Sequence, residues 1–319
     1  MNILVSGAAG FIGSHLSEQL AGSSHQVFGI DCLTDYYSHD LKASNIKEIS
    51  GKGVRFETLD LGSGDLKNVL QDIDVIYHLA AQPGISATTP FNDYLTNNII
   101  ATQRLLEEAK KSSRLQLFVN ISTSSVYGRD ASGNEQSEPL PTSWYGVTKL
   151  AAEQLVMAAC RDEGLPACSL RLFSVYGPRE RPEKLYPRLI DSIFKNKEFP
   201  LYEGSEKHIR SYTYIEDIII GLTAVLTHMK ECQGEIINIG TDKTITTGQG
   251  IKIVEQIIGK PAKIIRGPKR PGDQEKTHAN IEKARRILNY RPTVKPSEGL
   301  QEEVRWYKQL LDKNISLYP

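Results

Sequence analysis

Short apolar runs and amphipathic segments alternate along the first 173 residues of the chain. The apolar runs, which we expect to be buried strands, lie at residues 3–5, 26–30, 54–58, 75–79, 115–122 and 167–173. Hydrophobic residues recur at helical spacing in the intervening segments 11–20, 41–49, 94–109 and 145–160. Strands that alternate with helices and are joined by short loops predict an α/β fold with a doubly wound parallel sheet.

The regular alternation ends after residue 173. Beyond it we expect helices at 184–196, 217–228, 247–258 and 297–311, with extended segments at 210–214 and 235–239. The sequence therefore predicts a sheet domain over 1–173 and a smaller mixed α/β lobe over 174–319, with segments around 211–240 returning to the sheet domain. The cleft between the two lobes is the expected place of an active site.

Composition and charge exclude several classes of protein. The 319 residues hold 38 basic and 38 acidic side chains, so nothing indicates binding to nucleic acid or to an anionic membrane. No apolar run approaches the roughly 18 residues that a membrane span needs, and a strand expected from residue 2 leaves no room for a signal peptide. The four cysteines show no paired spacing, which favours free thiols in the cytoplasm and no metal site.

Three glycines, Gly7, Gly10 and Gly13, follow the first apolar run at intervals of three residues and enclose Phe11 and Ile12. This spacing predicts a strand, a tight turn and a helix whose first N–H groups face a pyrophosphate. A second apolar run ends on Asp31, and an acid about 20 residues after such a turn can bond the ribose hydroxyls of an adenosine and disfavour a 2′-phosphate. We therefore predict a Rossmann domain that prefers NAD to NADP.

Further cofactor contacts are expected where the third and fourth strands end. Asp60 and Leu61 could hold the adenine amino group and ring, although a simple turn is the alternative. Small and apolar residues after the fourth strand suit close passage of the cofactor and of a substrate, because open α/β sheets bind ligands at this edge. The residues concerned are Leu79, Ala80, Ala81, Pro83 and Gly84.

Tyr145 and Lys149 are four residues apart and lie on one face of a helix if residues 145–160 are helical. A tyrosine with an ordinary pKa near ~10 is a poor base at neutral pH. A neighbouring ammonium and a nicotinamide cation would favour its phenolate, which could then take the proton of a sugar or alcohol hydroxyl. Thr123, at the end of the fifth strand, is the expected hydrogen-bond partner of the reacting oxygen, with an ordinary turn residue as the alternative.

These motifs together resemble the extended short-chain dehydrogenase/reductase family over essentially the whole chain. The resemblance rests on the glycine turn 7–13, the stretch 78–81, Asn98, Thr123, Tyr145 with Lys149, and the stretch 175–179. It implies NAD bound by the Rossmann domain, with Asn98 among the cofactor contacts, and a nucleotide sugar in the C-terminal lobe. Arg210, Arg270 and Asp273 match positions that hold the UDP moiety in the epimerase branch, and paired arginines suit a diphosphate.

The two residues after Thr123 separate the branches of this family. Related 4,6-dehydratases carry Asp-Glu there, and UDP-glucuronate decarboxylases carry a glutamate at the second position. This chain has Ser124 and Ser125, and so lacks the acid and base for eliminating water and the glutamate of the decarboxylases. The resemblance then implies 4-epimerisation of a UDP-sugar through a transient 4-keto intermediate.

The identity of the sugar depends on Ser174 and Arg181. The stretch 174–182 looks most like that of UDP-glucuronate 4-epimerases, in which a small hydroxyl residue and an arginine face the sugar carboxylate. Hydroxyls of Thr123, Ser124, Ser125 and Ser174 with one guanidinium would suit a carboxylate. A surface charge remains the alternative for Arg181. Two departures are Ile85 and Ser86, where the uronate branch often has an arginine, and Trp144, where a proline is common.

Several alternatives stay open from the sequence. The substrate pair could be UDP-glucose and UDP-galactose or their N-acetylated forms, and less favoured possibilities are a UDP-glucuronate decarboxylase and a catalytically silent NAD-sensing protein. The family resemblance also implies a homodimer, in which helices containing 94–109 and 145–160 pair into a four-helix bundle. Alanines in the second helix would allow close packing, but a face buried within one chain would explain them equally well.

Overall fold

The computed structural model of the protein describes residues 1–67, 69–86, 88–268 and 274–318. Its centre is a seven-stranded sheet in the order β12-β7-β5-β4-β1-β2-β3, in which every neighbouring pair is parallel. The strands are β1 (Asn2–Ser6), β2 (Gln26–Asp31), β3 (Arg55–Thr58), β4 (Val75–His78), β5 (Leu117–Thr123), β7 (Ala167–Leu172) and β12 (Ile236–Ile239).

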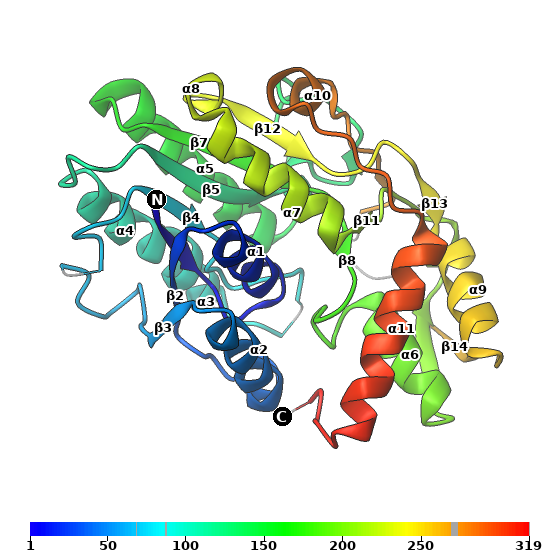
Figure 1. Cartoon of the computed structure of the whole chain (residues 1–319). Helices are drawn as coiled ribbons and strands as arrows, with labels where there is room; N and C mark the ends of the chain where they lie inside the picture. Colours follow the sequence, from blue (N-terminus) through cyan, green and yellow to red (C-terminus); the bar gives the residue numbers. More distant parts are fainter. Residues whose placement is uncertain (68, 87, 269–273, 319) are drawn as a thin grey trace.

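Helices cover both faces of this sheet (Figure 1). One face carries α1 (Phe11–Gly22), α2 (His39–Gly51) and α7 (Ile215–Ala224), and α1 packs against each of the other two. The other carries α4 (Ala101–Ala109) and α5 (Trp144–Glu163), with α5 lying on β5 and β7. The predicted α/β class and doubly wound parallel sheet are confirmed. Residues 236–239 also pair with β7, so the chain re-enters the sheet after contributing to the second lobe.

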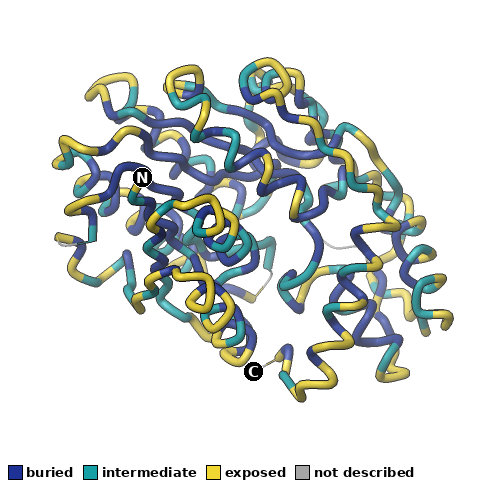
Figure 2. Tube along the Cα trace, viewed as in Figure 1, coloured by how far each residue is buried: buried dark blue, intermediate teal, exposed yellow. Residues whose placement is uncertain are grey.

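The apolar runs form the core because their strands are covered on both faces. Every residue of β4, β5 and β7 is buried, and Figure 2 shows a buried layer beneath helices with exposed outer sides. The edge strand β3 differs, because three of its four residues are exposed. Strands buried on both faces need apolar side chains in succession and not in alternation. This requirement explains why the runs were visible in the sequence.

The second lobe lies beside the carboxyl ends of the strands (Figure 1). It is built from α6 (Leu185–Phe194), α9 (Thr247–Ile258) and α11 (Pro296–Asp312), close to the predicted helices. A parallel pair, β9 (Glu198–Tyr202) with β14 (Lys263–Gly267), and the helix α10 (Glu282–Leu288) were not predicted. Short strands complete the lobe: β13 (Ile245–Thr246), β10 (Ile209–Arg210), β15 (Lys276–Thr277) and β6 (Asp130–Ala131) form one sheet, and β11 (Thr213–Tyr214) pairs with β8 (Val175–Tyr176).

The segment predicted as one helix over 94–109 differs from that prediction. It consists of α3 (Phe91–Tyr94), a π-helical turn (Leu95–Ile100) and α4, which follow one another directly. A π turn widens the helix by one residue and is common beside functional sites. Here it contains Asn98, whose buried side chain contacts the loop after β4.

Among the described residues, no helix combines the length and the apolar character that crossing a bilayer requires.

Candidate active site

A cavity of about 500 Å³ lies between the sheet and the second lobe. It runs along the carboxyl ends of the parallel strands, where open α/β sheets bind their ligands. Most of the residues predicted for the site line this cavity. They are Gly7, Gly10, Phe11, Ile12, Gly13, Asp31, Asp60, Leu61, Leu79, Ala80, Ala81, Pro83, Gly84, Thr123, Ser124, Ser125, Tyr145, Lys149, Ser174, Arg181 and Arg210.

The glycine turn between β1 and α1 is as tight as its sequence predicts. Gly7 has φ +74°, and a Cβ atom on Gly7 would lie 2.9 Å from the main-chain nitrogen of Ala80. A Cβ atom on Gly13 would lie 2.1 Å from the carbonyl oxygen of Gly7. Gly10 precedes α1 without any side-chain cap, so the first N–H groups of the helix are left for an anion. The turn fits the pyrophosphate of a dinucleotide.

Asp31 ends β2 beside this turn. Its carboxylate accepts hydrogen bonds from the main-chain N–H groups of Leu33 (2.9 Å) and Ala9 (3.2 Å), which fix its position at the cavity. Burial raises the pKa of Asp31, while these two bonds and the Lys42 ammonium oppose the rise. Lys42 also lines the cavity, although no motif indicated it. The position of Asp31 suits the ribose hydroxyls of an adenosine.

Asn98 does not line the cavity. Its Oδ1 accepts from the Gln82 main-chain N–H (2.7 Å), and its Nδ2 donates to Thr148 Oγ1 (2.9 Å) and the Gln82 carbonyl (3.3 Å). Its side chain is 1% exposed. Asn98 joins α5 to the loop 79–84, and its contact with the cofactor stays a prediction.

Tyr145 and Thr123 both line the cavity, and the Thr123 hydroxyl is near enough to the Tyr145 phenol to influence its pKa. Burial raises the pKa of Tyr145, and the opposing influences are the Arg181 guanidinium and the Thr123 hydroxyl. From the sequence, we expected the Lys149 ammonium to be the charge that lowers the pKa of Tyr145. The structure instead brings Arg181, a residue of the second lobe, into electrostatic contact with the phenol.

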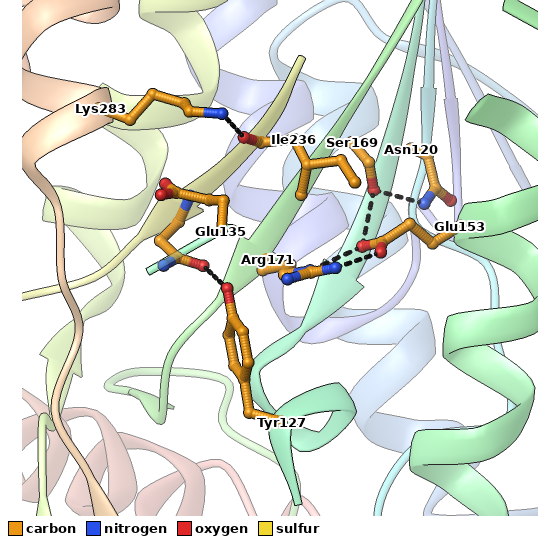
Figure 3. Close-up of polar contacts among 9 residues, drawn as sticks. Asn120, Tyr127, Glu135, Glu153, Ser169, Arg171, Ile236 and Lys283 are labelled. Carbon is orange, nitrogen blue, oxygen red and sulfur yellow. Dashed lines mark hydrogen bonds and ion pairs between the residues drawn. The ribbon is translucent and has the colours of Figure 1, made fainter. Parts of the chain in front are cut away.

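Lys149 is buried on the same helix as Tyr145, and burial lowers its pKa to about 8, opposed by Glu153. Glu153 is one further turn along α5 and forms a closed ion pair with Arg171 of β7 (Figure 3). Ser169 and Asn120 extend this network across the sheet, with Ser169 Oγ 3.3 Å from Glu153 Oε2 and Asn120 Nδ2 2.9 Å from Ser169 Oγ. The network fixes the helix face that carries Tyr145 and Lys149.

The second lobe supplies the other wall. Ser174 has φ +32° and its hydroxyl lies 3.4 Å from that of Thr277. Arg210 donates to the carbonyls of Ile209 (3.1 Å) and Gln274, which places its guanidinium at the cavity. Arg270 and Asp273, predicted for the UDP moiety, lie outside the described residues.

Several lining residues were missed by sequence reasoning. Gln274 donates from Nε2 to the carbonyls of Gly128 (2.8 Å) and Ser124 (3.2 Å) and so joins the second lobe to the end of β5. Tyr36 and Glu183 lie against Arg181. All three stand in loops without periodicity or a recurring motif, so only the tertiary structure brings them to the site.

A family model matches residues 3–240 of the chain, that of the NAD dependent epimerase/dehydratase family. The chain belongs to this family. A Bacillus subtilis (strain 168) protein named as an uncharacterized UDP-glucose epimerase is 39% identical over 315 residues, covering 97% of this chain and 99% of that protein. UDP-glucuronate 4-epimerase 6 of Arabidopsis thaliana is 33% identical and aligns with 96% of this chain and 71% of its own length.

Solved structures agree with this assignment. The crystal structure of a UDP-glucuronic acid 4-epimerase from Bacillus cereus, in complex with UDP-glucuronic acid and NAD, has a TM-score of 0.93 and 42% sequence identity. The alignment covers 97% of this chain and 100% of that one. The predicted resemblance to an epimerase of the extended short-chain dehydrogenase/reductase family is confirmed. NAD is likewise confirmed as the cofactor of this epimerase/dehydratase, and that the glycine turn and Asp31 hold its adenosine diphosphate half stays a prediction.

Proposed function

We propose that this protein is a 4-epimerase that interconverts UDP-glucuronate and UDP-galacturonate. The observation that carries the proposal is the place of Arg181, which lines the same cavity as Tyr145 and the serines that follow Thr123 and influences the pKa of Tyr145. A guanidinium with several hydroxyls suits a carboxylate. The named activity of the Bacillus cereus protein, at 42% identity, supports the same substrate.

The residues of the chain divide the chemistry between them. Tyr145 takes the proton of the C4 hydroxyl when C4 is oxidised and gives a proton back when C4 is reduced, with the Thr123 hydroxyl beside its phenol. NAD, when bound, takes up the C4 hydrogen and gives it back to the opposite face of the sugar. Lys149 supplies positive charge on the helix face below Tyr145.

A uronate brings a specific hazard that Arg181 and the serines address. Oxidation at C4 of a uronate gives a β-keto acid, which tends to lose carbon dioxide. Hydrogen bonds that keep the carboxylate charge localised resist this loss. Ser124, Ser125 and Ser174 line the cavity together with Arg181 and offer such bonds.

A panel of substrates tests the proposal. We would incubate the protein with UDP-glucuronate, UDP-glucose and UDP-N-acetylglucosamine without added NAD and resolve the products by NMR. UDP-galacturonate as the preferred product, with loss of that preference in Arg181→Met, supports the proposal. Formation of UDP-xylose or a 4-keto pentose would instead indicate a decarboxylase.

A neutral sugar is the second candidate substrate, favoured by the printed name of the Bacillus subtilis relative at 39% identity. In that case kcat/KM would be highest for UDP-glucose or its N-acetylated analogue. Replacing Arg181 by methionine would then change kcat/KM for all substrates alike, because activity would not depend on a contact between Arg181 and a substrate carboxylate.

We further propose that the protein is a homodimer. Exposed apolar side chains lie on adjoining elements: Phe91 of α3 (43% exposed) touches Trp144 of α5 (53% exposed), with ring centroids 5.7 Å apart, and Val147 (46%) follows. Such a patch is typical of an interface. Light scattering should give twice the mass of one chain, and Val147→Glu should give a monomer. A monomeric wild-type protein would contradict the proposal.

A cytoplasmic location is also our proposal. The four cysteines are all free thiols, as expected in a reducing compartment. Recovery of the protein in the cytoplasmic fraction of its own cells would support it, and recovery outside the cell would contradict it.

A further inference from the structure

Arg181 is held in a confined setting. Its side chain is 14% exposed, and its Cζ lies 5.8 Å from the centroid of the Tyr36 ring. Gly84, with φ +80°, approaches from the loop after β4, and a Cβ atom there would lie 3.5 Å from both Nη1 and Nη2. The guanidinium is therefore fixed by residues of the sheet domain, although Arg181 belongs to the loop that enters the second lobe.

The chain itself supplies a carboxylate to this guanidinium. Glu183 Oε1 lies 2.9 Å from Arg181 Nη1, and both residues line the cavity. The Glu183 side chain is 39% exposed, far more than that of Arg181. Glu183 can thus turn towards water at little cost, whereas Arg181 cannot leave without losing its contact with the Tyr36 ring and its burial.

We propose that Glu183 occupies Arg181 in the substrate-free protein and that the carboxylate of the substrate displaces it, which makes Glu183 a specificity-determining residue. The inference rests on the proposed uronate function. A substrate carboxylate can replace Glu183 charge for charge, and the displaced side chain regains its hydration. A neutral hydroxymethyl group cannot compete for the guanidinium, so Glu183 stays paired when a neutral sugar binds.

The expected consequence is that Glu183 weakens binding of uronates alone. In Glu183→Gln the guanidinium has no competing carboxylate, and like-charge repulsion of the substrate disappears. Since a partly exposed ion pair is a modest interaction, the Kd for UDP-glucuronate should fall about twofold to fivefold. The Kd for UDP-glucose should stay the same.

Calorimetric titration of the NAD-loaded protein with UDP-glucuronate and UDP-glucose tests this. The matched control is Glu302→Gln, which removes a carboxylate of similar exposure (42%) that pairs with Arg305 away from the cavity. The ratio of the two Kd values should change in Glu183→Gln and not in Glu302→Gln. In an Arg181→Met background, whose fold is checked by circular dichroism, Glu183→Gln should have no further effect.

The possible outcomes separate this inference from the proposed function. The inference is overturned if Glu183→Gln changes the Kd values of both sugars equally or leaves their ratio unchanged. It is also overturned if Glu183→Gln binds UDP-glucuronate more weakly, because Glu183 would then help Arg181 to bind it. If the wild-type protein converts UDP-glucuronate, such a result leaves the proposed function intact. If the wild-type protein neither binds UDP-glucuronate more tightly than UDP-glucose nor converts it, both fail.

Discussion

Glu153 of α5 and Arg171 of β7 form an ion pair that is closed to solvent, with side chains 0% and 1% exposed. Arg171 Nη2 lies 2.6 Å from Glu153 Oε1, and Arg171 Nε lies 3.0 Å from Oε2. The guanidinium also lies 4.7 Å from the centroid of the Tyr127 ring (Figure 3). This pair ties the helix of Tyr145 and Lys149 to the sheet.

Breaking this pair from either side should destabilise the fold. Glu153→Leu leaves a buried guanidinium without a partner, and Arg171→Met leaves a buried carboxylate. Each should lower the free energy of unfolding by about 3–5 kcal/mol. The double variant removes both charges and should lose far less than the sum. Urea unfolding of the four proteins would measure this, and additive losses would show that the two charges act independently.

Gly13→Ala should destroy the cofactor site. The new Cβ atom would lie 2.1 Å from the Gly7 carbonyl oxygen and 2.8 Å from its carbon, and these main-chain atoms cannot yield without opening the turn. We expect the purified variant to lack the NAD that the wild-type protein retains, as measured by chromatography after denaturation. Gly22→Ala, in the same helix with no atom within 4 Å of its Cβ, is the control and should retain NAD. Normal NAD content in Gly13→Ala would contradict the account of the turn.

The buried glutamates Glu180 and Glu303 should make the stability of the fold depend on pH. Both are buried, Glu180 in the loop after β8 and Glu303 on helix α11, and each influences the pKa of the other. Burial raises the pKa of Glu180 to about 8, opposed by Lys184 and Arg181, and raises that of Glu303 well above its usual range, with Glu180 adding to the rise. Because both pKa values are higher in the folded state, the folded protein binds more protons. Stability from this pair is complete below the ordinary glutamate pKa and is lost as the pH rises through about 8.

Glu303→Gln should reduce this loss, since the amide stays neutral at every pH. The decrease in Tm between about pH 6 and about pH 9 should be smaller than in the wild-type protein. Glu302→Gln, one residue earlier on α11 and exposed, should follow the wild-type curve. Parallel curves for all three proteins would mean that the buried pair does not control the pH dependence.

Much of the fold and site could be predicted because its signals are local. A sheet buried on both faces requires continuous apolar runs, and the glycine turn needs particular residues at fixed spacing. Residues at a strand's carboxyl end, such as Asp31 and Thr123, therefore reach the cavity by topology alone. The π turn around Asn98 was missed because one extra residue in a helix hardly alters the hydrophobic period.

Other features depend on contacts between distant segments. Strand β9 contains Pro200, and it pairs with β14, which is distant from it in the sequence. Neither strand therefore has a strong sequence signal of its own. Glu183, Tyr36 and Gln274 stand in loops, and their arrangement around the cavity follows from the packing of the two lobes. The electrostatic influence of Arg181 on Tyr145 also follows from the packing of the two lobes. The sequence shows only that Lys149 is one helical turn from Tyr145, so Lys149 was the residue we predicted to lower the pKa of Tyr145.

The central claim is that the hydrogen removed from C4 returns to the same sugar molecule while NAD stays bound. We would incubate the protein with UDP-glucuronate that carries deuterium at C4, mixed with an excess of unlabelled NADH, and follow the products by NMR and mass spectrometry. The account predicts UDP-galacturonate that keeps its deuterium at C4 and added NADH that acquires none. Product that has lost the deuterium, or deuterium in the added NADH, would contradict it.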